Sequence, residues 1–323
     1  MKLTVTSSPH IRGKESTGSI MGHVLLALLP ALAAGTLVYG LRALLVTAVT
    51  TAACLLSEWL FRVLTHQHNT LPDGSAAVTG VLLALTLPAT VPYWAAAVGG
   101  VFAVAAVKGL CGGIGQNIFN PALAGRAFLM LLWPAAITRY AALGQALPLF
   151  GSAADAVTAA TPLHHMQMPA LPEVSLADLF LGRVGGSIGE ASALALLIGG
   201  AWLVFRRVIS PRIPLTYLGT VAVLTLVFSK GDSPVLWMLY SLLSGGVILG
   251  AVFMATDYTT SPVTPRGQLF YGAGCGALTV VFRYFGLFPE GVTYAILLMN
   301  AAVWAIDRFT APRRFGTGKG GAA

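Results

Sequence analysis

One long, comparatively polar segment carries a stretch of small residues with a carboxylate and two hydroxyls, Asp155-Ala156-Val157-Thr158-Ala159-Ala160-Thr161-Pro162. The small neighbours leave the Thr161 hydroxyl unshielded, and Pro162 biases Thr161 away from helical dihedrals. A lone threonine in such a loop is, in most proteins, only part of a connection. A chemical role for Thr161 therefore depends on where the rest of the chain places it.

Polar residues and prolines also interrupt apolar sequence at Leu71–Gly80, which leads into Leu85–Pro88. Glycine, serine and threonine at this close spacing are typical of a tightly packed or broken helix, whose freed amides could face a ligand. Plain packing of small residues between helices explains the same pattern, so both interpretations stay open.

The segment Gly112–Arg126 combines glycines, amide side chains and a helix-starting proline in Asn120-Pro121. This pattern predicts a re-entrant turn before a helix, whose N-terminal amides suit a carbonyl-rich or anionic group. Because a charge is costly in lipid, Arg126 should face protein, a cavity or an anion. We favour a functional role here, with Arg126 as a candidate cofactor contact.

A third segment, Met254–Pro265, places six hydroxyls, one carboxylate and two prolines between consecutive apolar runs. It is either functional or a proline-rich turn capped by Asp257. Carboxylates inside or at the ends of apolar runs are candidates for an ion path, although each could instead anchor a helix end or pair with an arginine. These carboxylates are Glu58, Glu190, Asp257 and Asp307.

Composition identifies the class of protein that must hold these groups. Of 323 residues 56% are hydrophobic and 9% charged, with mean hydropathy +0.79, which excludes a soluble globular chain and predicts a polytopic membrane protein. The polar start, Met1–Ser19, does not resemble a cleaved signal peptide. The excess of 19 Lys and Arg over 11 Asp and Glu fits basic cytoplasmic loops better than nucleic-acid binding.

Cysteine and histidine spacing supports no metal or disulfide site. With no CxxC spacing, neither an iron–sulfur site nor a disulfide framework is expected from this chain alone. The cysteines are Cys54, Cys111 and Cys275, and the loop histidines that we expect to be solvated are His66, His68, His164 and His165.

A helix needs about 20 apolar residues to span a bilayer, which predicts ten spans in an all-α fold. The third is short and bounded by prolines, and the fifth is broken near its start, so both are broken or re-entrant candidates. The spans are approximately 20–40, 42–64, 75–90, 92–108, 118–136, 189–206, 213–229, 235–254, 268–286 and 291–308.

Charge counting orients the chain. A cytoplasmic N-terminus places thirteen basic residues inside and five outside, as the positive-inside rule requires. The loop bearing Thr161 then faces outward between two five-span halves, and an odd number of spans gives the halves opposite orientations, as in inverted-repeat transporters. The predicted parts are 1–19 (cytoplasmic), 20–137 (first half), 138–186 (outward-facing loop), 187–309 (second half) and 310–323 (cytoplasmic tail).

Taken together, these segments resemble one known family nearly end to end. The chain is similar to the RnfD component of the Rnf complex, an ion-translocating ferredoxin:NAD oxidoreductase, and to the related NqrB component of the sodium-pumping NADH:quinone oxidoreductase. The stretches that carry the resemblance are Ser8-Pro9-His10, Asp73–Gly80, Gly113–Arg126, Gly186–Glu190, Phe253–Pro265, Leu297–Asn300 and Asp307–Thr310.

The resemblance implies a covalent flavin. In that family, a motif Asp-x-x-Ser/Thr-Gly/Ser-Ala-Thr carries FMN on its last threonine through a phosphoester. Asp155, Thr158, Ala160 and Thr161 match it, whereas Ala159 departs where glycine or serine is usual. Thr161 would hold the FMN, Thr158 could hydrogen-bond its phosphate, and Asp155 would brace the loop or be recognised by the flavin transferase. A second, non-covalent flavin, riboflavin, is also implied.

The resemblance further implies a flavin-bearing electron-transfer subunit in the bacterial cytoplasmic (inner) membrane, coupling electron flow between ferredoxin and NAD to movement of Na⁺ or H⁺. Its partners would be the other Rnf-type subunits, including those with ferredoxin, NAD and iron–sulfur sites. Two alternatives remain from the residues alone: an inverted-repeat solute channel or transporter without redox chemistry, and a passive membrane scaffold for redox partners.

Overall fold

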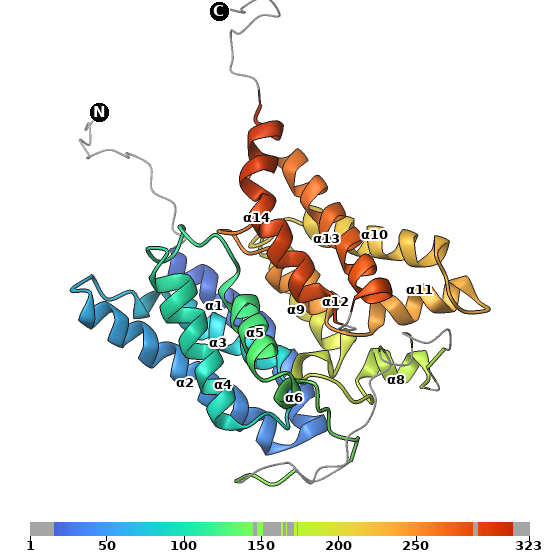
Figure 1. Cartoon of the computed structure of the whole chain (residues 1–323), viewed down its shortest axis with the longest axis horizontal. Coiled ribbons are helices and arrows are strands. Elements are labelled where there is room, and N and C mark those ends of the chain that lie inside the picture. Colours follow the sequence, from blue (N-terminus) through green and yellow to red (C-terminus); the bar gives the residue numbers. More distant parts are fainter. Residues whose placement is uncertain are drawn as a thin grey trace, which may run out of the picture.

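The computed structural model describes residues 16–144, 147–150, 163, 166, 171–172, 174–286 and 290–312. These residues are predominantly helical (Figure 1), as the composition predicts. The first half contains α1 (Thr17–Tyr39), α2 (Leu41–Leu64), the 3₁₀ turn η1 (Leu71–Asp73), α3 (Ser75–Thr86), α4 (Tyr93–Val101) with its π-helical continuation η2 (Phe102–Gly109), α5 (Pro121–Leu132) and α6 (Pro134–Ile137).

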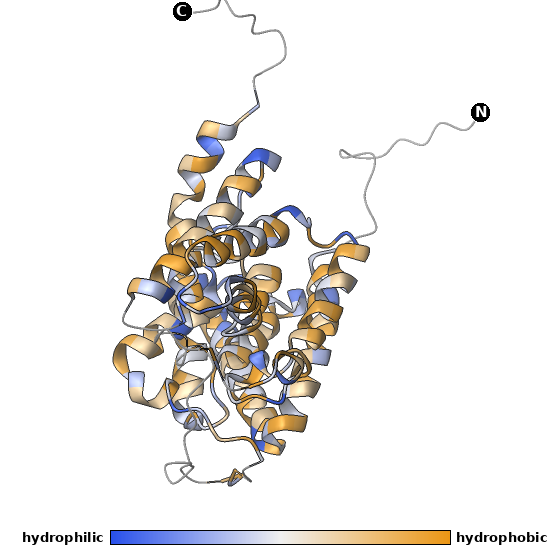
Figure 2. Cartoon of the chain, turned by 90° about the vertical axis from the view of Figure 1, so that its right-hand side faces the viewer, coloured by the Kyte–Doolittle hydropathy of each residue, from blue (hydrophilic) through white to orange (hydrophobic). Residues whose placement is uncertain are grey.

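The second half begins after a short surface helix, α8 (Leu176–Leu181), and the 3₁₀ turn η3 (Ile188–Glu190). Its helices are α9 (Ala193–Phe205), α10 (Arg212–Val227), α11 (Pro234–Leu243), α12 (Val247–Leu249) with the π-helical η4 (Gly250–Met254), α13 (Pro265–Phe285) and α14 (Val292–Thr310). α1 begins and α14 ends at the same end of the molecule (Figures 1 and 2), which we name the inner end; the opposite end is the outer end.

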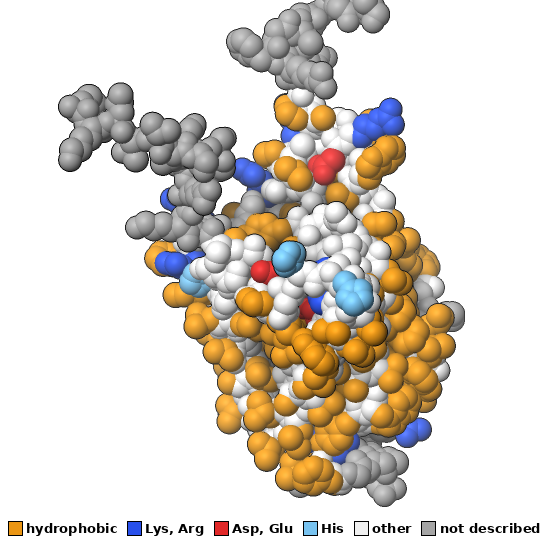
Figure 3. Space-filling model, turned by 90° about the vertical axis from the view of Figure 1, so that its left-hand side faces the viewer, with side chains coloured by type: hydrophobic (Ala, Val, Ile, Leu, Met, Phe, Trp, Pro, Cys, Tyr) orange, Lys and Arg blue, Asp and Glu red, His pale blue; other side chains and the backbone are white. Residues whose placement is uncertain are grey.

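The surface is that of a membrane protein. Apolar residues dominate the helices in Figure 2, and Figure 3 shows a continuous apolar flank, with most of the visible charged side chains in the upper half of the view. Large apolar side chains such as Leu131 (80% exposed) and Phe205 (79%) face outward, where lipid rather than water suits them.

The predicted count of ten full spans is not confirmed. Among the described residues, α1, α2 and α14 are long and apolar enough to cross a membrane, and α11 with α12 and η4 forms a fourth candidate bent by 62°. The predicted span 268–286 coincides with α13, which has 21 residues but is not among the helices apolar enough to cross a membrane. The remaining predicted spans coincide with shorter apolar helices of 10–17 residues. The third and fifth, α3 and α5, have 12 residues each, or about 18 Å at 1.5 Å per residue, against about 30 Å of hydrocarbon.

Local sequence explains why α3 and α5 are short. α3 ends at Thr86, and the extended residue Leu87 precedes Pro88, as expected for a residue before proline. α5 begins after Asn120, whose side chain accepts hydrogen bonds from Ala122 N (3.1 Å) and Leu123 N (3.3 Å). The predicted turn followed by a helix at this point is therefore confirmed.

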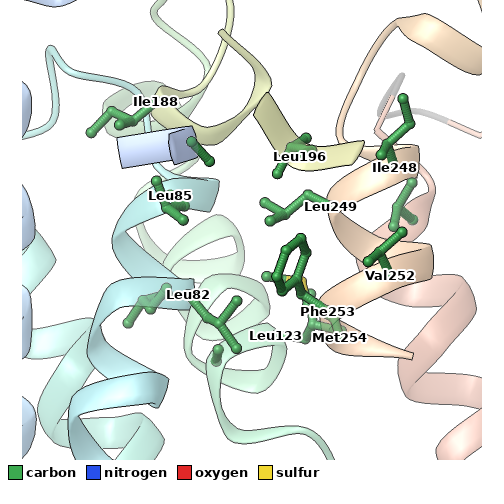
Figure 4. Close-up of a cluster of buried hydrophobic side chains, with 14 of the residues drawn as sticks. Leu82, Leu85, Leu123, Ile188, Leu196, Ile248, Leu249, Val252, Phe253 and Met254 are labelled. Atoms are coloured by element: carbon green, nitrogen blue, oxygen red, sulfur yellow. The ribbon is translucent and has the colours of Figure 1, made fainter. Parts of the chain in front are cut away.

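Small residues allow the two halves to pack closely. α1 packs against α9, where a Cβ built on Gly199 would lie 2.0 Å from the Ala27 carbonyl oxygen. Close approach of this kind is how membrane helices gain van der Waals contact. Near the centre, side chains of both halves meet in one apolar cluster (Figure 4), so the halves share a core. Whether they are related by inversion stays a prediction.

Candidate functional site

The predicted flavin motif lies outside the described residues: Asp155, Thr158 and Thr161 fall within 151–162. The chain is described again immediately downstream, at Leu163 and Met166, and both side chains are buried. Leu163 and Met166 themselves lie against the second half of the protein, beside Trp237 and Tyr284.

Leu163 rests where α11 breaks from α12. Gly245 lies in this break at φ +65°, and a Cβ there would lie 2.5 Å from Leu163 Cδ2. Arg283 stabilises the break, because its guanidinium donates to the carbonyls of Ser241, Ser244 (2.7 Å) and Gly245 (2.9 Å). A buried cation thus satisfies the free carbonyls at the end of α11. We name the pocket lined by Leu163, Met166, Trp237, Ser241, Arg283 and Tyr284 the outer seat.

A larger cavity opens toward the inner end, and we name it the inner cavity. The N-termini of α3 and α5 both border it, through Ser75 and Pro121. Helix N-termini favour anionic and carbonyl-rich groups. Asn117, 9% exposed, lines the cavity, and its Oδ1 atom has no hydrogen-bond partner among the described residues. The remaining lining residues are Met21, Val24, Val78, Thr79, Leu82, Lys108, Ile114, Asn120, Ala122, Leu203, Ile209, Phe253, Thr256, Asp257, Tyr258 and Thr259.

Glu58, a predicted ion-path candidate, lies behind the wall of this cavity. It forms a buried ion pair with Lys108 (Nζ to Oε1, 2.6 Å), and both side chains are 3% exposed. The Lys108 ammonium also donates to Ser75 Oγ (2.6 Å), and the Thr70 hydroxyl donates to the same Glu58 oxygen (2.6 Å). The carboxylate therefore stays out of contact with lipid through a pairing that the sequence does not reveal.

Asp257 lines the inner cavity, as its position in Met254–Pro265 suggested. Its carboxylate accepts hydrogen bonds from Thr259 (3.1 Å) and Thr260 (3.2 Å). Burial raises the pKa of Asp257 above its ordinary value of 3.8, and these hydrogen bonds oppose that rise. Asp307 instead accepts backbone N–H bonds from Val263 (3.2 Å) and Thr264 just before α13, and so anchors a helix end rather than facing a cavity.

A second cavity lies on the other side of the central core and is named the outer cavity. Arg126 reaches it from α5, forms an ion pair with Glu290 and donates to the carbonyl of Thr86 at the end of α3. Tyr140 also donates to Glu290. Arg126 thus faces protein and a cavity, as predicted; its role as a cofactor contact stays a prediction.

Glu190, another of the four ion-path candidates, lines the outer cavity beside Gly246. Glu190 packs closely against the backbone of Gly246, because a Cβ on Gly246, at φ +58°, would lie 3.0 Å from Glu190 Oε1. The cavity therefore brings together Glu190, Glu290 and Arg126, two negative charges and one positive. The other lining residues are Thr86, Leu123, Gly245, Leu249, Met254, Val292 and Thr293.

Buried apolar side chains shown in Figure 4 line the two cavities from opposite sides. Leu82 and Phe253 line the inner cavity, whereas Leu123, Leu249 and Met254 line the outer one, and all five are buried in the same cluster. We name these five residues the apolar layer. A hydrated ion would have to lose its water to pass such a layer. In this conformation the apolar layer is therefore a barrier to ions.

Sequence reasoning missed three partners, Lys108, Glu290 and Tyr140. Lys108 was counted only as an inner basic residue, although a lysine at the end of an apolar run is itself a signal of a buried pair or cavity. Within the described ranges, no group of three or more His, Cys, Asp and Glu side chains is arranged to hold a metal ion.

Comparison with known proteins extends over nearly the whole chain. A relative from Acetobacterium woodii, named as the D component of a Na(+)-translocating ferredoxin:NAD(+) oxidoreductase complex, is 49% identical over 99% of this chain and 97% of its own. A relative from Clostridium ljungdahlii, named as the D component of a proton-translocating complex of the same kind, is 41% identical over 97% and 96%. One from Stutzerimonas stutzeri, the D component of an ion-translocating oxidoreductase complex, is 40% identical over 94% and 93%.

The model of one protein family matches residues 4–316, which include both cavities, the outer seat and the flavin motif. This match and the identities above agree with the resemblance carried by the sequence motifs. The chain therefore belongs to the NQR2, RnfD, RnfE family.

Proposed function

We propose that this chain is the membrane-embedded RnfD-type component of an ion-translocating ferredoxin:NAD⁺ oxidoreductase complex. The observation that carries the proposal is the end-to-end similarity to relatives with that printed name, at up to 49% identity. The arrangement of two cavities, each with charged side chains in its lining, on either side of an apolar layer supports it, because an ion-translocating subunit needs polar groups on both sides of a barrier. No NAD or ferredoxin motif is recognisable in the sequence, so those sites would lie on partner subunits.

Thr161 is proposed to carry FMN through a phosphoester. The motif match at Asp155, Thr158, Ala160 and Thr161 supports this assignment, which requires a flavin transferase for maturation. Leu163, two residues downstream of Thr161, is buried and lines the outer seat. The flavin would supply one- and two-electron chemistry, and the chain would supply attachment, orientation and electrostatics. A covalent bond prevents loss of a cofactor that faces bulk water.

The inner cavity is proposed to hold the non-covalent flavin, riboflavin. The residues present fit such a group: Asn117 Oδ1 is buried and unpartnered, two helix N-termini can meet carbonyl oxygens, and Lys108 adds a positive charge. Apolar side chains, including Met21 and Phe253, suit a planar aromatic ring. Bound there, the flavin would supply the redox chemistry, while these residues would orient it and exclude water.

The ion path is proposed to run between the cavities. Asp257 and Glu58 would serve the inner side, and Glu190, with Glu290, the outer side. The apolar layer would have to open, or its flanking helices move, for Na⁺ or H⁺ to pass. The named relatives include both a Na⁺- and a proton-translocating complex, so the choice of ion is a question for transport assays.

The proposed setting is the bacterial cytoplasmic membrane, with both termini cytoplasmic and the flavin loop outside. The common inner end of α1 and α14 supports this placement of the termini. The count of thirteen basic residues against five supports the orientation.

The test uses the full chain produced together with a flavin transferase. The intact mass should exceed that of the bare polypeptide by one FMN phosphoester, and the denatured chain should fluoresce as a flavoprotein in a gel. Thr161→Ala should abolish both signals, whereas Thr158→Ala should leave attachment possible at the intact Thr161. A Thr161→Ala chain that keeps the fluorescence would refute the attachment site, and a colourless wild-type chain that passes a solute in liposomes would favour a channel.

A further inference from the structure

Lys108 contacts both the inner cavity and a buried carboxylate. Its side chain lines the inner cavity, yet its ammonium lies 2.6 Å from Glu58 Oε1 and 2.6 Å from Ser75 Oγ. The side chain is buried, so water does not screen its charge. A change of charge in the cavity therefore acts directly on the bond between Lys108 and Glu58.

Glu58 depends on this bond for its charge balance. Its Oε1 atom accepts from both Lys108 and Thr70, whereas its Oε2 atom is buried and has no hydrogen-bond partner among the described residues. A buried carboxylate that loses its cation is strongly destabilised unless another positive charge replaces it. The free Oε2 atom is the position where a replacement cation could bind.

A polar route connects Glu58 to the inner surface. The Thr70 hydroxyl accepts a hydrogen bond from Arg62 Nε (3.2 Å), and Arg62 in turn donates to the exposed Gln67. Only one hydroxyl therefore separates the carboxylate from side chains that reach the surface. This hydrogen-bonded chain links Glu58 to side chains at the inner surface, on the inner side of the apolar layer.

We propose that Lys108 is a positioning residue that links negative charge in the inner cavity to cation uptake at Glu58. The inference rests on the proposed function, which places a redox group in that cavity. When the complex delivers one electron there, the Lys108 ammonium moves toward the new negative charge and its bond to Glu58 weakens. Glu58 then accepts one cation, Na⁺ or H⁺, from the inner side. One electron and one cation enter together, so the net charge of the site is unchanged.

Thermodynamic linkage makes the proposal measurable. A cation that binds more tightly after reduction must raise the reduction potential, by an amount proportional to the logarithm of the ratio of its two affinities. The sample is the full chain carrying Thr161→Ala, whose only flavin would be the non-covalent one. Its reduction midpoint is measured by redox titration at low and high Na⁺, with choline keeping the ionic strength constant, and again at two pH values. We expect the midpoint to report a change in cation affinity of about 5–150-fold between redox states. In Lys108→Gln this ratio should fall toward one.

Two controls accompany the titration. Lys108→Arg keeps the charge and should keep most of the cation-dependent shift, whereas Arg139→Gln, which changes a cation outside the cavity, should keep all of it. Flavin content is measured first by extraction. A wild-type chain without flavin would contradict the proposed function, whereas Lys108→Gln with bound flavin and an unchanged shift would overturn this inference alone.

A second readout does not need the flavin. In flavin-free chain, Lys108→Gln leaves Glu58 without its ammonium, so Na⁺ or H⁺ should raise the melting temperature of this variant more than that of the wild type. Lys108→Gln/Glu58→Gln should lose that dependence. If the single variant does not fold, Lys108→Met/Glu58→Leu replaces the pair by apolar residues, a change that buried pairs often tolerate. A cation-dependent midpoint that survives in this double variant would also overturn the proposal.

Discussion

The ion pair of Arg126 and Glu290 joins the two halves, and its loss should be costly. Arg126→Met leaves Glu290 with Tyr140 as its donor among the described residues and leaves the Thr86 carbonyl without its guanidinium partner. Burial raises the pKa of Tyr140 to about 12, so Tyr140 remains a donor at neutral pH but brings no charge. Removing one partner of a buried pair costs about 3–5 kcal/mol, and an unpaired buried carbonyl about 1–3 kcal/mol. We expect Arg126→Met to lower the free energy of unfolding by about 4–8 kcal/mol, the sum of the two contributions.

The assay is a double-mutant cycle on the full chain, unfolded by increasing SDS in mixed micelles and followed by tryptophan fluorescence. Combining Arg126→Met with Glu290→Leu should cost about 2 kcal/mol less than the sum of the single changes, because neither charge is then left alone. Arg183→Met is the control, since Arg183 and Asp178 are a largely exposed pair 4.0 Å apart and should contribute less than about 1 kcal/mol. Additivity within about 0.5 kcal/mol would refute the reasoning.

Two further predictions concern Asp257 and Gly245. Because burial raises the pKa of Asp257, ion transport by the complex should fall as the pH drops through that raised value. This loss of transport at acidic pH should disappear in Asp257→Asn. A wild-type loss at the pKa of an ordinary aspartate would contradict the buried position of Asp257. Gly245→Ala puts a Cβ at φ +65° and against Leu163, and should lower the free energy of unfolding by about 1–3 kcal/mol. The helical Gly219, with open space around it, is the matched control, and an equal loss in Gly219→Ala would contradict the close fit.

Much of this protein follows from local features of the sequence. Apolar runs place the helices, because a chain in lipid must satisfy its backbone hydrogen bonds within each segment. Prolines and the Asn120 cap mark where α3 ends and α5 begins, since both act within one turn of helix. The same local information raised Asp257 and Arg126 as functional candidates, and the flavin motif is visible only as a sequence pattern, because it lies outside the described residues.

The sequence could not reveal which charges meet. Arg126 pairs with Glu290 across the two halves, and Lys108 of η2 pairs with Glu58 of α2. Arg42 and Arg283, two of the five basic residues that the charge count assigns to the outer side, are buried and donate to backbone carbonyls. Ion pairing depends on distances of a few ångströms, and helix packing alone sets these distances between residues far apart in the chain. The tertiary structure therefore decided which carboxylates are neutralised and which face a cavity.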